Sequence, residues 1–123
     1  MKHPADKLKK RLILVYLAYS KKNFYWRQHL SKIVLRMGYV PLNPFMIFDY
    51  FLLDALPRDK VRLANNNLIM RVDEIWVVGD ISDGIAAEIR LARKLKKKIR
   101  YFSTNSLPKK LKEVKKEDLK TEK

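Results

Sequence analysis

The sequence contains no cysteine among its 123 residues. This absence excludes a disulfide framework and a cysteine-ligated metal, and it fits a reducing cytoplasm. Histidine is almost as scarce: His3 and His29 lie far apart, so a histidine-based metal site or a Ser-His-Asp arrangement has little support. We therefore expect a cytoplasmic protein that uses neither a metal nor another cofactor.

Glycine is also scarce, with Gly38, Gly79 and Gly84 as the three examples. Neither G-x-G-x-x-G nor G-x-x-x-x-G-K-[ST] can be drawn through them, which argues against ordinary dinucleotide or nucleoside triphosphatase chemistry. No apolar segment approaches the roughly 20 residues of a membrane span, and nothing resembles a signal peptide. The sequence thus predicts a protein with no membrane partner.

Positive charge is abundant: 28 Lys and Arg residues face 13 Asp and Glu residues, for a net charge of +15. Most of the excess lies at the two ends, in residues 1–13 and 93–123. These ends are interpreted as solubilising segments or a thermophile's Lys/Glu bias, with an arm that binds nucleic acid or a partner as the alternative. In either case the charge favours non-specific, salt-dependent binding of nucleic acid. We divide the chain into a basic segment (1–10), an α/β domain (11–103) and a basic tail (104–123).

Residues 72–102 form the segment around which the fold is expected to be built. Residues 75–78 are apolar, as in a strand buried on both faces. Turn residues at 80–84 follow, and residues 99–102 form a second strand. Between them, apolar residues recur at helical spacing: Ile85, Ile89, Ala92 and Leu95. In such a βαβ unit, ligands bind beyond the carboxyl ends of the strands, which places a site at the 80–84 turn.

The remainder of the chain continues the alternation of strands and helices. We expect strands at 11–18 and 39–42, helices at 24–37 and 58–71, and Asn23 as the cap of the first helix. This order predicts a doubly wound, mostly parallel sheet of the flavodoxin or Rossmann kind in a three-layer α/β/α fold. Four strands in the order 2-1-3-4 are expected, and the tail or a partner is expected to contribute a fifth at the edge.

Two segments carry unusual compositions. Ten of the twelve residues at 45–56 are apolar or aromatic, which fits a buried helix, a subunit interface or an apolar lid over a flat ligand. Burial against a second subunit, in a homo-oligomer, is the interpretation we favour. Asn65, Asn66 and Asn67 are adjacent in a predicted helix, where asparagine is unfavourable. We expect at least one of these side chains to make a specific contact. The alternative is that they are exposed to solvent or cap a helix.

Carboxylates cluster around the 80–84 turn. Asp73 and Asp80 are most simply strand ends, and Asp83 is most simply a helix N-cap. Glu88 lies about one turn into the predicted helix, near its positive end, which favours an ionised nucleophile or hydrogen-bond acceptor over a general acid. A solvated surface glutamate is the equally weighted alternative.

Three segments in order carry a resemblance to a known family: V-Y-L-A at 15–18, D-E-I-W-V-V-G-D-I-S-D-G-I-A-A-E-I-R-L-A at 73–92, and the final strand. Over residues 11–102 the sequence resembles the nucleoside 2-deoxyribosyltransferase-like superfamily, and especially its small uncharacterised members. The resemblance implies an enzyme, a transferase or hydrolase, that acts on the N-glycosidic bond of a nucleoside or nucleotide in an oligomer. Glu88 would attack the anomeric carbon, Asp83 would contact the sugar, and Tyr16 would orient the glutamate.

The sequence also departs from this family. Asn65 stands where the enzymes usually carry an aspartate, and an amide can bind a base but cannot give it a proton. A second carboxyl beside the nucleophile would have to come from Asp83 or Asp49. In the first loop, Lys21, Lys22 and the helix end at Asn23 are expected to hold a phosphate. The predicted substrate-binding residues are Asn65, Ser82, Gly84, Asn43, Lys22 and Asn23.

Three functions remain open on this basis. The first is an enzyme of N-glycosidic bonds that uses Glu88, which requires Glu88 and Tyr16 to meet at one pocket. The second is a non-catalytic nucleotide-binding or sensing module with the same fold. The third is a nucleic-acid-associated protein that acts through its basic ends. We rank the first slightly ahead of the second, and both ahead of the third.

Overall fold

A five-stranded sheet in the order β2-β1-β3-β4-β5 forms the centre of the molecule. The structure, a computed structural model, describes residues 3–48 and 50–122. The first four strands are parallel and the last is antiparallel. They are β1 (Leu14–Tyr19), β2 (Val40–Leu42), β3 (Glu74–Val78), β4 (Lys98–Ser103) and β5 (Lys112–Val114). The predicted strand order is confirmed, and the tail supplies the fifth strand.

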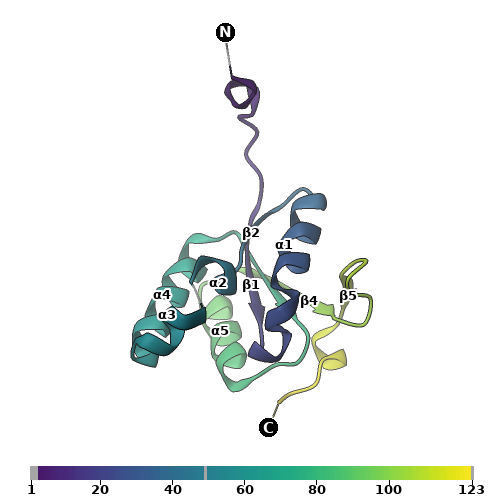
Figure 1. Ribbon diagram of the computed structural model, residues 1–123. Coiled ribbons are helices and arrows are strands. Elements are labelled where there is room, and N and C mark those ends of the chain that lie inside the picture. The colour runs from purple at the N-terminus through teal and green to yellow at the C-terminus, as the bar shows by residue number, and fades with distance from the viewer. Residues whose placement is uncertain (1–2, 49, 123) are drawn as a thin grey trace.

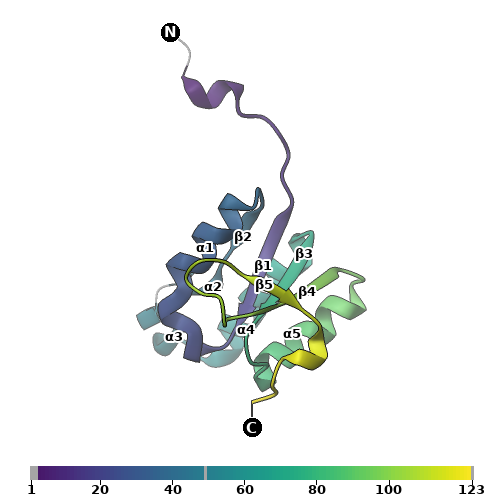
Figure 2. The same cartoon turned by 90° about the vertical axis from the view of Figure 1, so that its right-hand side faces the viewer.

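Helices cover both faces of this sheet, which confirms the three-layer fold. Figure 2 shows α1 and α5 on opposite sides of the strands. The helices are α1 (Arg27–Arg36), α2 (Pro44–Ile47), α3 (Tyr50–Ala55), α4 (Arg58–Arg71) and α5 (Asp83–Lys94). Three 3-10 helices accompany them: η1 (Pro4–Lys7), η2 (Lys21–Trp26) and η3 (Lys116–Asp118). None of the helices in the described part of the chain combines the length and apolar character needed to cross a membrane.

Each face of the sheet has its own apolar core. β3 is buried at every residue, as expected for a strand covered on both sides. Trp76 and Phe102 pack with residues of α1 on one face, whereas Tyr16 and Ile75 pack with Ile89 of α5 on the other. Alternate residues of β1 therefore serve different cores. This alternation directs Tyr16 toward α5.

Two predicted helix starts are wrong, and serine hydroxyls explain both. The first helix was expected over 24–37 with Asn23 as its cap. Instead, the Ser20 hydroxyl accepts a hydrogen bond from the Lys22 amide at 3.3 Å and begins η2, so the α-helix starts only at Arg27. At α5 the N-cap is Ser82, whose hydroxyl accepts from the Ile85 amide at 3.3 Å, and Asp83 is the first helical residue.

The apolar run at 45–56 does not form a single buried helix, which was one of its three interpretations. Backbone in the β region at Phe48 ends α2, and α3 begins at Tyr50. Among the side chains of this run that the structure describes, four apolar ones are more than 40% exposed: Met46, Ile47, Leu52 and Leu56. Phe45, by contrast, packs against the apolar core on the α1 side of the sheet. The subunit interface expected here stays a prediction, and Asp49 lies outside the described residues.

The two basic ends differ in their packing. Residues 3–13, with η1, extend away from the body of the molecule (Figure 1). The C-terminal tail instead pairs with β4 through β5 and buries Leu111 in the core. Farther along, the amide of Ile81 donates to the Lys120 carbonyl at 2.7 Å, and the Glu122 amide donates to the Ile81 carbonyl at 2.8 Å. The tail therefore holds the loop from which α5 begins.

Candidate functional site

A pocket of about 420 Å³ lies between α4, α5 and the chain that follows β1. Its volume is typical of sites for small molecules. Tyr19 and Ser20 from the end of β1, and Ser82 and Gly84 from the loop after β3, contribute to its wall. The pocket thus lies beyond the carboxyl ends of two parallel strands, at the edge of the sheet where the topology predicts a site.

Glu88 and Tyr16 meet at this pocket. Glu88 lies on α5 with its carboxyl in the pocket wall, and its Oε2 accepts a hydrogen bond of 2.5 Å from the Tyr16 hydroxyl. Tyr16 belongs to β1 and is only 1% exposed, so its hydroxyl reaches the carboxylate from the core side of α5. The sheet and α5 together fix the position of the Glu88 carboxyl. This is the juxtaposition that the first functional hypothesis required.

The protonation state of Glu88 differs from the one expected. Burial raises the pKa of Glu88 to about 7, and the hydrogen bond from Tyr16 lowers that pKa but does not offset the burial. Glu88 follows Asp83 by five positions, beyond the first turn of α5, where the helix dipole has largely faded. Desolvation therefore prevails. Near neutral pH, both the carboxylate and the carboxylic acid of Glu88 are populated.

Tyr16 is a hydrogen-bond donor throughout the physiological range. Burial and, next, the charge of Glu88 raise the pKa of Tyr16 well above its usual value. The phenol consequently keeps its proton whenever Glu88 is ionised. Tyr16 can orient the carboxylate without competing for a proton.

Asn65 lines the pocket from α4, and its Oδ1 is buried without a hydrogen-bond partner among the described residues. Leaving a buried acceptor unsatisfied costs about 1–3 kcal/mol, so a ligand donor at this place would recover that cost. Asn66 also lines the pocket. Asn67 does not: its amide nitrogen donates to the Leu63 carbonyl at 2.9 Å, and its Oδ1 accepts from Arg71 at 3.0 Å.

Several predicted site residues lie away from the pocket. The side-chain nitrogen of Asn43 donates to the Arg27 carbonyl and to Ser31, both at 3.1 Å, and its oxygen accepts from the Tyr19 hydroxyl at 2.7 Å. Asn43 therefore ties elements together and caps α2. Asp83 begins α5 but does not contribute to the pocket wall.

Of the predicted phosphate ligands, Lys22 and Asn23 are absent from the pocket wall, whereas Lys21 lines it. The Lys22 ammonium lies 4.0 Å from Asp80 and 3.7 Å from Glu122. Asn23 packs against Gly79, which has φ +77°. A Cβ atom at Gly79 would lie 2.8 Å from the side-chain nitrogen Nδ2 of Asn23. These residues join the first loop to the loop after β3 and to the tail.

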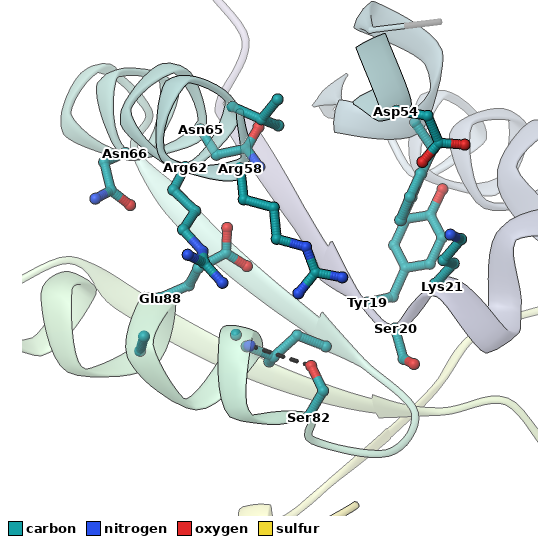
Figure 3. Close-up of a pocket in the computed structure, with 15 residues that line it drawn as sticks. Tyr19, Ser20, Lys21, Asp54, Arg58, Arg62, Asn65, Asn66, Ser82 and Glu88 are labelled. Atoms are coloured by element: carbon teal, nitrogen blue, oxygen red, sulfur yellow. Dashed lines mark hydrogen bonds between the residues drawn. The ribbon is translucent and has the colours of Figure 1, made fainter. Parts of the chain in front are cut away.

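Sequence reasoning missed the charged residues that α3 and α4 bring to the pocket. Asp54, Arg58 and Arg62 all line it, and Figure 3 shows the Arg58 guanidinium directed into the cavity. One signal was present: Arg58, Arg62 and Asn65 recur at i, i+4 and i+7, which places them on one face of α4. Within the described residues there is no group of three His, Asp or Glu side chains suited to a metal ion.

Comparison with solved structures identifies the fold. The chain is similar to a 2-deoxyribosyltransferase from Leishmania mexicana, with a TM-score of 0.57 and 23% identity over 76% of this chain and 65% of that one. It therefore spans less than two thirds of that protein. A 2-deoxyribosyltransferase from Bacillus psychrosaccharolyticus gives a TM-score of 0.56 and 17% identity over 76% of this chain and 74% of that one. The predicted resemblance is confirmed as a likeness of fold.

No curated protein matches the sequence. A family model, by contrast, matches residues 13–102, from the start of β1 to β4. This match covers well over half of the chain. The chain accordingly belongs to the family described as a domain of unknown function, DUF7768.

Proposed function

We propose that this protein cleaves or exchanges the N-glycosidic bond of a nucleoside or nucleotide, with Glu88 as the nucleophile. The observation that carries the proposal is the Glu88 carboxyl, which faces the pocket and is held by Tyr16 at 2.5 Å. The fold supports it, because two proteins that share the fold are named as 2-deoxyribosyltransferases. Fold alone does not carry function, so the proposal rests on the site.

The reaction would proceed in two displacements. In the first, a Glu88 carboxylate oxygen bonds to C1′ of the sugar while the bond from C1′ to the base breaks. The bonding pair leaves with the base, which takes a proton from water and leaves hydroxide. In the second, the oxygen of that hydroxide bonds to C1′, or the nitrogen of another base does so while its N–H proton passes to the hydroxide, and Glu88 departs again as a carboxylate. Hydrolysis and base exchange differ only in this second nucleophile.

The surrounding residues have distinct parts in this proposal. Tyr16 is a positioning residue, because its hydroxyl holds one carboxylate oxygen and leaves the other for C1′. Asn65 offers an unsatisfied acceptor to an N–H or O–H group of the substrate. Phe45, Val61 and Ile85 supply apolar surface for the faces of the base and sugar.

A second candidate is a nucleotide-binding or sensing module that does not turn its ligand over. The amide at Asn65 favours it, because this side chain has no proton to give to a departing base. The raised pKa of Glu88 also leaves part of the protein without a carboxylate nucleophile at neutral pH. Both features reduce catalysis while leaving the pocket intact.

Release of free base distinguishes the two candidates. A panel of nucleosides, 2′-deoxynucleosides and their 5′-monophosphates is incubated with the protein, with and without an acceptor base, and the products are separated by chromatography. We expect Glu88→Gln to lower release by about a thousandfold or more, because the nucleophile is gone. Glu117→Gln, a change at an exposed glutamate of η3, is the matched control and should leave release unchanged.

Turnover that survives Glu88→Gln would overturn the proposed mechanism. If no member of the panel reacts while a nucleotide still raises the melting temperature, the binding module takes its place. Tyr16→Phe adds a test of positioning. Its hydrogen bond lowers the pKa of Glu88, so its loss should move the acidic limb of the kcat/KM profile to higher pH. A lower melting temperature with an unmoved limb would assign Tyr16 a structural role.

A further inference from the structure

The pocket contains more basic than acidic side chains. Lys21, Arg58 and Arg62 line it, against the carboxyls of Asp54 and Glu88. Glu88 accepts a hydrogen bond from Tyr16, and Figure 3 shows Asp54 on the side of the pocket opposite Glu88. A neutral nucleoside would leave Arg58 without a counterpart. An anionic group on the ligand would supply one.

Arg58 is the cation best placed to meet such a group. It begins α4, and its guanidinium extends into the pocket between Glu88 and the chain that follows β1 (Figure 3). It has no hydrogen bond or ion pair with any residue that the structure describes. Arg62, one turn later, is paired with Asp59 at 3.0 Å. A guanidinium offers parallel N–H donors that match two oxygens of a phosphate, so Arg58 is free to bind one in this way.

The α4 wall also distinguishes two ends of the pocket. Arg58, Arg62 and Asn65 lie on one face of the helix, and at 1.5 Å per residue the first and last are separated by about 10 Å along its axis. The first end is cationic. The second presents the unsatisfied Oδ1 of Asn65, which calls for a donor. A ligand that suits both ends carries an anionic group at one side and N–H or O–H groups at the other.

We propose that Arg58 forms an anion subsite and that the pocket takes a nucleoside 5′-monophosphate in preference to the free nucleoside. This inference rests on the proposed function, which places the sugar at Glu88. The phosphate then meets Arg58, with Arg62 adding positive charge beside it, and the base or a sugar hydroxyl donates to Asn65. The phosphate subsite expected at Lys21, Lys22 and Asn23 is thereby moved to α4, with Lys21 elsewhere in the pocket wall.

Binding measurements test the subsite without requiring turnover. Calorimetry is performed in the Glu88→Gln background, so that no ligand is consumed, with deoxynucleosides, their 5′-monophosphates and inorganic phosphate. We expect the monophosphates to bind about tenfold to a hundredfold more tightly than the nucleosides, because a charge-assisted bidentate pair between Arg58 and the phosphate contributes about this much. Arg58→Gln should abolish this difference and leave nucleoside affinity nearly unchanged. Arg58→Lys should retain part of it, because the charge remains but the paired donors do not.

Arg90→Gln is the matched control, since it removes the same charge from an exposed position of α5 outside the pocket wall. It should preserve the preference for monophosphates. Three results would overturn the subsite. They are equal affinity for nucleosides and monophosphates, an equal loss of monophosphate affinity in Arg58→Gln and Arg90→Gln, and no binding of any monophosphate at millimolar concentration. The two proposals fail separately. A phosphate preference without base release refutes the glycosidic activity, whereas base release without a phosphate preference refutes the subsite.

Discussion

The two helical walls of the pocket are anchored to the protein very differently. α5 buries Ile85, Ile89 and Ala92 against the sheet, whereas in α4, whose side chains are all described, only Ile69 is buried. α5 positions Glu88, and α4 positions the arginines and Asn65. In the proposed function, the group that forms a bond therefore lies on the firmly packed wall. The groups that recognise the substrate lie on the weakly packed one, where local opening requires less free energy.

Alanine substitutions at the two walls should produce the largest contrast. Ile89 is 2% exposed on α5, and Leu63 is 60% exposed on α4. We expect Ile89→Ala to lower the free energy of unfolding by about 3 kcal/mol, because it opens a cavity in the core. Leu63→Ala should change it by less than about 0.5 kcal/mol. Urea denaturation followed by circular dichroism measures both, and similar values for the two variants would refute the difference in anchoring.

The pH dependence of the free energy of unfolding should show the cost of burying the ionised Glu88 carboxylate on α5. The pKa of Glu88 is raised from 4.5 to about 7 in the folded protein. The folded state therefore binds a proton more tightly than the unfolded state, and this contribution is full below pH 4.5 and is lost as pH rises through 7. Between these values the wild type should lose about 3 kcal/mol relative to Glu88→Gln, which cannot ionise.

Denaturation of both proteins at several pH values between 4.5 and 8 provides the measurement. Other titrating groups are shared by the two proteins and cancel in the difference. Glu117→Gln, at an exposed site, serves as the comparison and should follow the wild type. A difference between wild type and Glu88→Gln that stays constant with pH would show that Glu88 is not desolvated.

The α5 wall of the pocket could be predicted from the sequence, because the patterns that indicate it are local. The β3 run, the helical spacing of α5 and the strand after it specify a βαβ unit, and parallel topology then brings Tyr16 of β1 beside Glu88. The helix caps were less predictable. Each true cap had a competitor nearby, Asn23 three residues after Ser20 and Asp83 next to Ser82, and the choice depends on which side chain reaches a free amide.

On α4, Asn65 was predicted as a substrate-binding residue but the arginines were not, because charged residues on a helix face have the same pattern whether they meet solvent or a cavity. Arg58 and Arg62 are distinguished only by the position of α4 beside α5, which is a tertiary feature. The tail was predictable in part. Its lysines suggested a solvated end and the fifth strand was expected from the tail or a partner; Leu111 and the strand pairing of β5 show that the tail supplies it. The N-terminal end, of similar composition, extends away from the body (Figure 1).

Asn65→Asp should produce the smallest of these effects, a change in the rate of base release, because it places a carboxylic acid on α4. A carboxylic acid at this position can donate a proton to the departing base, which the amide cannot. We expect release of base to rise about tenfold, well below the effect of an optimised general acid, because the surrounding wall is not arranged for it. Asn67→Asp is the matched control, since Asn67 lies on the same helix but bonds to Leu63 and Arg71 outside the pocket. The rise should appear only in Asn65→Asp and should fade at higher pH as the new acid ionises. Equal rates in the two variants would show that proton transfer to the base does not limit the reaction, and that α4 contributes recognition alone.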